Sequence, residues 1–144
     1  MTIVGYDEKY KDDVIQVIHN FYTEALSEYS SAIDESVLLK TIDQYKDGTF
    51  LLIINDKCEG VFAGATTTSP INSDKVLQEL VWYVNKPHRL SGVFFLRQVE
   101  AELKRRGYAQ LVMALMANSK AEKIASLYGR MKFKLFESHY IKNL

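Results

Sequence analysis

The feature that most constrains the fold is a run of three strand-like segments that ends in a turn and an amphipathic helix. The first two, "TFLLIIN" (49–55) and "VFAGATTTS" (61–69), are largely apolar and are separated by "DKCEG", a pattern typical of a hairpin. The third, "VLQELVWYV" (76–84), is followed by Pro87 and by "HRLSG", after which an apolar helical pattern begins at Gly92. This order predicts a mixed sheet covered by helices.

Two helices are predicted between a short first strand, "TIVGY", and the hairpin. From Asp7 to about Leu26 the apolar residues recur at three- and four-residue spacing, which is typical of an amphipathic helix. Asp34 is placed to cap a second helix through "VLLKTIDQY". Both helices precede the strands of the hairpin.

The rest of the sequence predicts a helix at 92–106, a strand at 109–117, a helix at 119–131 and a strand at 134–144. Gly107 is well placed as the C-terminal cap of the first of these helices. The predicted fold class is α/β (α+β), a mixed, mostly antiparallel sheet flanked by helices, in one domain over residues 1–144. The last strand would have an exposed edge, through which two copies could pair as a homodimer.

Composition excludes several classes of protein. Lys plus Arg and Asp plus Glu both number 18 in the 144 residues, so no field of one sign draws the chain to nucleic acid. Cys58 is the only cysteine, and the three histidines show no metal-ligand spacing, so we expect neither a disulfide nor a metal site. The N-terminal sequence lacks a signal-peptide pattern and no segment is long enough to span a bilayer, which predicts a cytoplasmic protein without membrane contact.

Two motifs carry a resemblance to a known family. Arg89 and Gly92 in "RLSGVF" follow a strand and a proline-containing turn, and Leu127 and Tyr128 in a predicted helix are followed by "MKF". With the order of elements, these residues resemble the GNAT superfamily of N-acetyltransferases, whose coenzyme A signature is Gln or Arg, two residues, Gly, one residue, then Gly or Ala. The combination "VWYV…P..R" with a terminal "HYIK" also resembles small acetyltransferase-like proteins of tailed bacteriophages.

The sequence departs from the family pattern at two positions. Phe94 stands where the family has a small residue, so its side chain has to point away from a bound anion and could fill the core beside Phe95. Lys132 replaces the glycine of the family's Gly-Phe pair. If that position needs a left-handed backbone, a residue other than glycine costs about 1–2 kcal/mol.

The resemblance implies acetyl-CoA as cofactor, with its pyrophosphate at the start of the helix that begins at Gly92. The physical reason is that a helix start offers N–H groups without intrahelical partners and about half a positive charge. The same turn without the family context is a weak sign, because every strand-to-helix turn has such groups. The predicted cofactor contacts are Val84, Arg89, Leu90, Ser91, Gly92, Val93, Phe94 and Asn118.

Tyr128 and Glu79 are the catalytic residues that the resemblance implies. Tyr128 matches the family's tyrosine that faces the cofactor sulfur, and a tyrosine of pKa about 10 can donate a hydrogen bond to a departing thiolate. Glu79 lies in an otherwise apolar strand, where burial would raise its pKa toward the range of a general base. The alternatives are a core tyrosine for Tyr128 and an edge-exposed or structurally paired glutamate for Glu79. Period-two alternation places Glu79, Val81 and Tyr83 on one face of the strand.

Val84 and Asn118 complete the predicted site. Near Val84 the family splays this strand from the next, which frees an N–H to polarise the thioester carbonyl. Asn118 is expected either to cap the following helix or, by the resemblance, to contact the pantetheine arm.

Two functions from different classes remain open, together with a third possibility, cofactor binding without useful catalysis, as in a sensor. The first is transfer of an acetyl group from acetyl-CoA to a primary amine, on a small molecule or a peptide, by direct attack. The second is a GNAT-like fold that serves as an interaction or virion-associated module without acetyltransferase activity, which the departures at Phe94 and Lys132 favour. The sequence carries no motif that names an acceptor.

Overall fold

The computed structural model describes residues 1–144 and contains a five-stranded sheet in the order β1-β2-β3-β4-β5. Neighbouring strands are antiparallel except for β4 and β5, which are parallel, so the predicted mixed, mostly antiparallel sheet is confirmed. The strands are β1 (Thr2–Gly5), β2 (Thr49–Ile54), β3 (Lys57–Thr68), β4 (Lys75–Val84) and β5 (Gln110–Val112).

The hairpin between β2 and β3 turns earlier than predicted. Its two turn residues are Asn55 and Asp56, with φ of 51° and 62°, and Ile54 pairs with Lys57. Two left-handed residues match the right-handed twist of the flanking strands, which is why Asn and Asp are favoured there. Most of "DKCEG" therefore belongs to β3 rather than to the turn.

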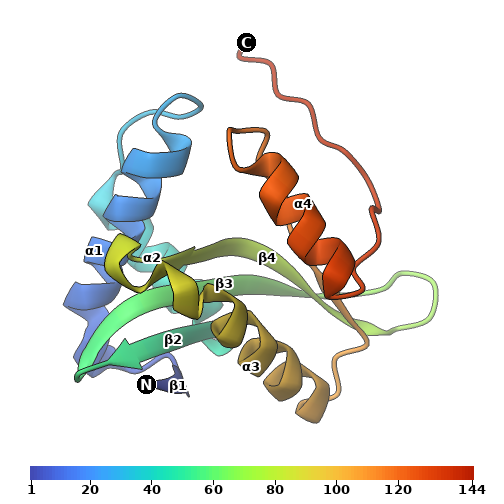
Figure 1. Ribbon diagram of the computed structural model, residues 1–144, viewed down its shortest axis with the longest axis horizontal. Coiled ribbons are helices and arrows are strands. Elements are labelled where there is room, and N and C mark those ends of the chain that lie inside the picture. The colour runs from blue at the N-terminus through green and yellow to red at the C-terminus, as the bar shows by residue number, and fades with distance from the viewer. The chain divides into compact units, whose positions relative to one another are not determined.

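Helices cover both faces of this sheet (Figure 1). On one face, Val14 and Val17 of α1 are buried in a cluster with Leu51, Val61 and Val81 from the strands. On the other face lie Phe50, Phe62 and Leu77 of the sheet, and α3 contributes the buried side chains of Phe95, Leu96, Val99 and Leu103. The helices are α1 (Lys11–Phe21), continued by a π-helical turn η2 (Tyr22–Leu26), then α2 (Glu35–Tyr45), α3 (Gly92–Arg105) and α4 (Ala121–Arg130).

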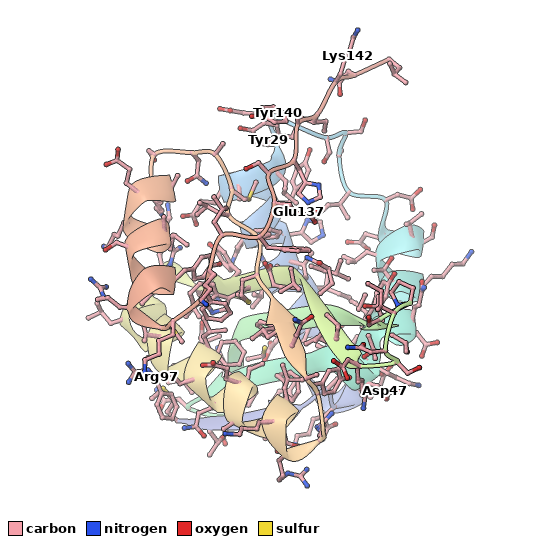
Figure 2. The ribbon with its side chains drawn as sticks, turned by 90° about the vertical axis from the view of Figure 1, so that its right-hand side faces the viewer. Tyr29, Asp47, Arg97, Glu137, Tyr140 and Lys142 are labelled. Atoms are coloured by element: carbon pink, nitrogen blue, oxygen red, sulfur yellow. The ribbon has the colours of Figure 1, made fainter.

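The outer face of α3 is polar, as its amphipathic pattern predicts. Arg97 is exposed and projects from this face (Figure 2). At the end of the helix, Gly107 has φ of +83° and the N–H of Tyr108 bonds to the carbonyl of Leu103, which confirms Gly107 as the cap.

The chain divides into two compact units, Met1–Ala114 and Leu115–Leu144. The first unit contains the whole sheet with α1, α2 and α3, and the second contains α4 and the segment that follows it. That residues 1–144 act as one domain stays a prediction. None of the helices has the length and apolar character needed to cross a membrane.

The predicted strand at 134–144 is wrong, and the one at 109–117 is too long. The segment after α4 has no secondary structure, and Glu137, Tyr140 and Lys142 lie along an irregular chain (Figure 2). Leu135, Phe136 and Tyr140 are 86%, 81% and 97% exposed. Strand propensity alone does not form a strand, because the ladder needs a partner. The predicted homodimer depended on the exposed edge of this strand, so that reason for expecting it no longer applies.

Cys58 lies in the core of the first unit. It is 3% exposed, and its Sγ donates to the carbonyl of Gly60 at 3.3 Å. Burial raises the pKa of this thiol to about 12. The thiol is therefore protonated and inaccessible in the native protein.

The helix α4 ends in a Schellman motif with a lysine at the left-handed position. Lys132 has φ of 66°, and the N–H of Phe133 bonds to the carbonyl of Tyr128 while that of Lys132 bonds to Gly129. The rings of Tyr128 and Phe133 lie 5.4 Å apart, the apolar contact that accompanies this motif. Lys132 therefore has the left-handed backbone in which a residue other than glycine carries a cost.

We expect Lys132→Gly to raise the free energy of unfolding by about 1 kcal/mol, because glycine adopts φ of 66° without the Cβ clash. Urea denaturation measures the change. Lys132→Ala is the control, since it removes the charge but keeps the Cβ, and it should give no gain. Gly107→Ala, at the equivalent position after α3, should lose a similar amount. An equal gain in Lys132→Ala would assign the effect to charge instead.

Candidate active site

β5 makes a ladder with only the first part of β4, and the remaining edge of β4, residues 79–84, is called the open edge because β5 does not pair with it. β5 pairs with β4 only at Val76, Leu77 and Gln78. On the other side of β4, Val84 faces Gly60, and the N–H of Asn85 bonds to the carbonyl of Glu59 at 2.8 Å. Val84 and Gly60 are therefore a non-hydrogen-bonded pair, and the N–H and C=O of Val84 point toward the open edge. The end of the ladder at Gln78 agrees with the predicted divergence of the two strands, and the role of the Val84 N–H stays a prediction.

A β-bulge in β4 changes which side chains share a face. Val81 pairs with Ala63 and Glu79 pairs with Gly64, so Leu80 is an extra residue without a partner in β3. As a result, Leu80 and Val81 both line one cavity on the α1 side. The prediction that Glu79 shares a face with Val81 is wrong, because the bulge interrupts the period-two alternation.

Glu79 lies at the start of the open edge and is partly buried. Its Oε2 accepts a hydrogen bond from the N–H of Ala114 at 2.8 Å, just after β5 ends. Burial raises the pKa of Glu79 to about 7, although the Ala114 N–H acts in the opposite direction. A carboxyl that titrates near neutral pH can accept a proton in one step and release it in the next.

The turn after β4 forms a 3-10 helix, η4 (Lys86–Ser91), that leads directly into α3. Pro87 occupies its first turn, and His88 has non-helical dihedral angles that kink it. Ser91, at the N-cap of α3, makes no side-chain capping bond. The start of α3 therefore keeps backbone N–H groups that no side chain of the cap satisfies.

Two apolar side chains flank this helix start. Leu90 is 100% exposed and Phe94 is 41% exposed. The expectation that Phe94 fills the core beside Phe95 is wrong, since only Phe95 is buried. Val93, between them, is partly buried.

Gly92 brings the start of α3 close to β4. Its φ of −58° is helical, and a Cβ placed there would lie 3.7 Å from Cζ2 of Trp82 and 4.0 Å from Cγ2 of Val84. These are ordinary contact distances, so the position has room for a Cβ but for little more. A side chain at this position would point toward β4. The close packing of α3 against β4 therefore favours glycine here, a reason that the sequence alone does not reveal.

Arg89 is held by three groups of the first unit. Its Nε donates to the carbonyl of Val84 at 3.0 Å, and its Nη1 and Nη2 donate to the two carboxylate oxygens of Glu24 at 3.1 and 2.9 Å. The guanidinium also lies 5.1 Å from the ring centre of Tyr83, whose hydroxyl donates to Glu24 at 2.7 Å. Burial and the contact with Glu24 raise the pKa of Tyr83 to about 12. Arg89 therefore shapes the turn, and its contact with phosphate stays a prediction.

Sequence reasoning missed Glu24. It lies in η2, where the N–H of Ser27 bonds to the carbonyl of Tyr22 five residues earlier. Such π-helical turns are rare and frequently accompany functional sites, but they have no sequence signature that periodicity detects. The sequence shows only that an acidic residue lies in the last turn of the helix predicted through Leu26, which does not indicate a role for it.

A cavity of 470 Å³ lies on the α1 side of the sheet. It is bounded by α1, η2, residues 30–34, α2, β3 and β4, and its wall is mainly aliphatic and aromatic. The wall contains one acid, Asp34, and no Lys, Arg or His. Asp34 caps α2 by accepting from the N–H groups of Ser36 and Val37. The hydrogen bond from the Ser36 hydroxyl, with those from the two N–H groups, lowers the pKa of Asp34.

Tyr128 and Asn118 belong to the second unit. Tyr128 is partly buried in α4. Asn118 does not cap α4 directly, because the N-cap is Lys120, whose N–H bonds to Oδ1 of Asn118 at 3.0 Å. The helix starts later than predicted, so Asn118 instead shapes the turn before it. The roles of both residues in catalysis and cofactor binding stay predictions.

The three histidines each lie near a single carboxylate. His19 lies 3.3 Å from Glu35, His88 lies 3.9 Å from Glu59, and His139 lies 3.0 Å from Glu137. No three or more His, Cys, Asp and Glu side chains are grouped so that they could hold a metal ion. His139 is in the irregular C-terminal segment rather than in a strand.

Solved structures place this arrangement of strands and helices in a known fold. The match to an aminoglycoside acetyltransferase, meta-AAC0020, from an uncultured soil metagenomic sample covers 99% of this chain and 95% of that protein. Its TM-score is 0.75 and the sequence identity is 16%. The match to the ribosomal-protein-alanine N-acetyltransferase of Brucella melitensis biovar Abortus 2308 covers 99% of this chain and 98% of that protein, with a TM-score of 0.74 and 16% identity. The match to a transcriptional regulator from Bacillus halodurans C-125 covers 99% of this chain and 99% of that protein, with a TM-score of 0.77 and 12% identity.

The chain therefore has the fold of the GNAT acetyltransferases. No protein-family model and no curated protein matches the sequence. At these identities the likeness concerns the fold, and the chemistry has to be argued from the residues.

Proposed function

We propose that this protein is an acetyl-CoA-dependent N-acetyltransferase that acts on a primary amine. The observation that carries the proposal is the open edge of β4. A carboxyl with a pKa of about 7, Glu79, lies at one end of it, and the outward N–H of Val84 lies at the other. A proton acceptor and a hydrogen-bond donor along the part of β4 that β5 does not pair with are what amide formation from a thioester requires.

The residues of the first unit fit the cofactor. The N–H groups around the start of α3, from Leu90 to Phe94, would bind the pyrophosphate, helped by the helix dipole, except that of Gly92, which already donates to the carbonyl of Arg89. The uncapped Ser91 supports this assignment, because no side chain competes for those groups. Acetyl-CoA supplies the activated acetyl group as a thioester. In the second unit, Asn118 is proposed to contact the pantetheine arm.

The chemistry assigned to the chain has three parts. Glu79 accepts the proton that the amine loses as its nitrogen bonds to the acetyl carbon. The N–H of Val84 donates a hydrogen bond to the carbonyl oxygen, where negative charge develops. Tyr128 donates a hydrogen bond to the sulfur as the carbon–sulfur bond breaks, and the proton from Glu79 ultimately restores the thiol.

A thermal-shift titration with acetyl-CoA tests the proposal. Ligand at a hundred times its dissociation constant adds about 2.7 kcal/mol to the free energy of unfolding, a shift of several degrees for this size. We expect Gly92→Val to weaken the affinity at least tenfold, because its methyl groups would press α3 away from Trp82 and Val84. Gly5→Val is the control, since its site has open space. No saturable shift in the wild type would contradict the proposal.

A second candidate is an interaction module without acetyl transfer. The exposed side chains of Leu90 and Phe94 beside the start of α3 favour it, because they leave an apolar pair uncovered next to the predicted pyrophosphate site. In that case acetyl-CoA would not shift the unfolding temperature at millimolar concentration. A bacteriophage origin and a cytoplasmic location stay predictions.

A further inference from the structure

One ion pair ties the π-helical turn η2 to the end of β4. The Glu24 carboxylate accepts two hydrogen bonds from the Arg89 guanidinium, at 3.1 Å from Nη1 and 2.9 Å from Nη2. The two side chains are 22% and 36% exposed, so solvent screens this pair less than a pair on an open surface. A two-pronged contact of this kind fixes the plane and direction of a guanidinium as well as its position. Glu24 therefore decides where the third nitrogen of Arg89, Nε, points.

The Nε of Arg89 points at the backbone of β4. It donates to the carbonyl oxygen of Val84 at 3.0 Å. A neighbouring strand that extended the ladder to Val84 would place an N–H at this same oxygen, so the guanidinium lies where the backbone of that strand would run. Arg89 thus closes this end of the open edge to a further strand without using the N–H of Val84, which points to the same side.

The N–H of Val84 lies between two backbone positions that the ion pair holds. The peptide group that follows Val84 is bonded at both ends, because its carbonyl accepts from Arg89 and its N–H donates to the carbonyl of Glu59 at 2.8 Å. On the preceding residue, the ring of Tyr83 lies 5.1 Å from the guanidinium and its hydroxyl donates to Glu24 at 2.7 Å. Since peptide groups are planar, few rotations remain between these two positions. The direction of the Val84 N–H therefore depends on the ion pair.

We infer that Glu24 is a positioning residue for acetyl transfer, which acts through Arg89 to direct the Val84 N–H at the carbonyl oxygen of the bound thioester. The inference rests on the proposed function, in which this N–H stabilises the charge that develops on that oxygen. A donor of this kind has to be held within about 0.5 Å of its productive position by the residues around it. Loss of Glu24 should therefore weaken the polarisation of the thioester and leave the affinity for acetyl-CoA nearly unchanged.

Infrared spectroscopy of acetyl-CoA labelled with ¹³C at the acetyl carbonyl tests this inference without an acceptor amine. A hydrogen bond to the oxygen weakens the C=O bond, so the stretching frequency should fall when the labelled cofactor binds to the wild type. Glu24→Gln keeps the size of the side chain and removes its charge. In this variant we expect the frequency to return about halfway or more to its value in free acetyl-CoA, with a dissociation constant within about a factor of two of the wild type. Glu28→Gln, which changes an exposed acid in the following turn, is the matched control and should give the wild-type frequency.

A double-variant cycle separates action through Arg89 from a direct effect of the Glu24 charge. In the Arg89→Gln background, Glu24→Gln should cause no further change in the carbonyl frequency. Exchange of the Arg89 Nε–H with water, followed by NMR, is a readout that needs no cofactor. It should be slow in the wild type and at least tenfold faster in Glu24→Gln, because the contact that holds this N–H against Val84 is lost.

The results distinguish this inference from the proposed function. An equal fall in frequency in the wild type and in Glu24→Gln would overturn the inference and leave the acetyltransferase standing. The same holds for an equal effect of Glu24→Gln in both backgrounds, and for an Arg89 Nε–H that exchanges rapidly in the wild type. Binding of acetyl-CoA without any fall in frequency would overturn the role of the Val84 N–H, and with it that of Glu24. No binding of acetyl-CoA to the wild type would overturn the proposed function itself.

Discussion

Replacing Glu79 by glutamine is expected to lower kcat/KM for the amine about 100-fold or more, the range in which a positioned general base contributes. The rate of the wild type should rise with pH and level off above about 7, where Glu79 becomes ionised. The variant should lose this dependence, because glutamine does not titrate. A pH–rate profile measured by thiol release checks both effects. Glu28→Gln, an exposed acid, is the control.

The same substitution, which lowers activity, is expected to raise the free energy of unfolding at high pH. The folded protein holds the Glu79 proton up to a pH of about 7, whereas the unfolded chain releases it near 4.5. Between these values the native state binds more protons, so the free energy of unfolding falls as the pH rises. Above pH 7 the wild type bears the cost of a partly buried carboxylate, at most about 3 kcal/mol for a shift of this size.

Glu79→Gln should therefore be more stable than the wild type at pH 8.5 and similar to it at pH 4. Denaturation at the two pH values measures the difference. A stability gain without a loss of turnover would identify Glu79 as a structural residue, and full activity with a normal pH profile would remove it as the base.

Tyr128→Phe is expected to reduce kcat about 30-fold while the affinity for acetyl-CoA stays within a factor of two. The lost group is one hydrogen bond to a sulfur that becomes negative, and a bond to a charged group contributes about 2 kcal/mol. The ring of Tyr128 remains to pack against Phe133. Stopped-flow turnover and equilibrium titration with the cofactor separate the two quantities.

Tyr140→Phe is the control for this measurement, because Tyr140 is 97% exposed in the C-terminal segment. An equal loss of affinity and rate in Tyr128→Phe would argue that the hydroxyl supports the fold of α4. An unchanged rate would remove Tyr128 from the mechanism.

The sequence was sufficient for the features that depend on neighbours along the chain. The hairpin of β2 and β3, the helix α3 and its cap at Gly107 follow from spacing and turn chemistry within short segments. A left-handed backbone at Lys132 was considered only as a condition, because the family has glycine there, and φ of 66° meets that condition.

The features that depend on distant partners were missed. The C-terminal segment has strand-like residues but no strand to pair with, and periodicity does not report a partner. The bulge at Leu80 follows from the register between β3 and β4 rather than from the residues themselves. The pairing of Arg89 with Glu24 joins residues 65 apart in the chain and depends on the π-helical turn.

Cys58 makes the chain convenient to assay. A reagent that reacts with thiolates would detect coenzyme A as it is released, with almost no background from the native protein, because its one cysteine is buried and protonated. The same reagent would count one thiol per chain once the first unit unfolds. A single chromogenic reaction could thus report turnover of the intact enzyme and, with denaturant added, the fraction of molecules that have lost their core.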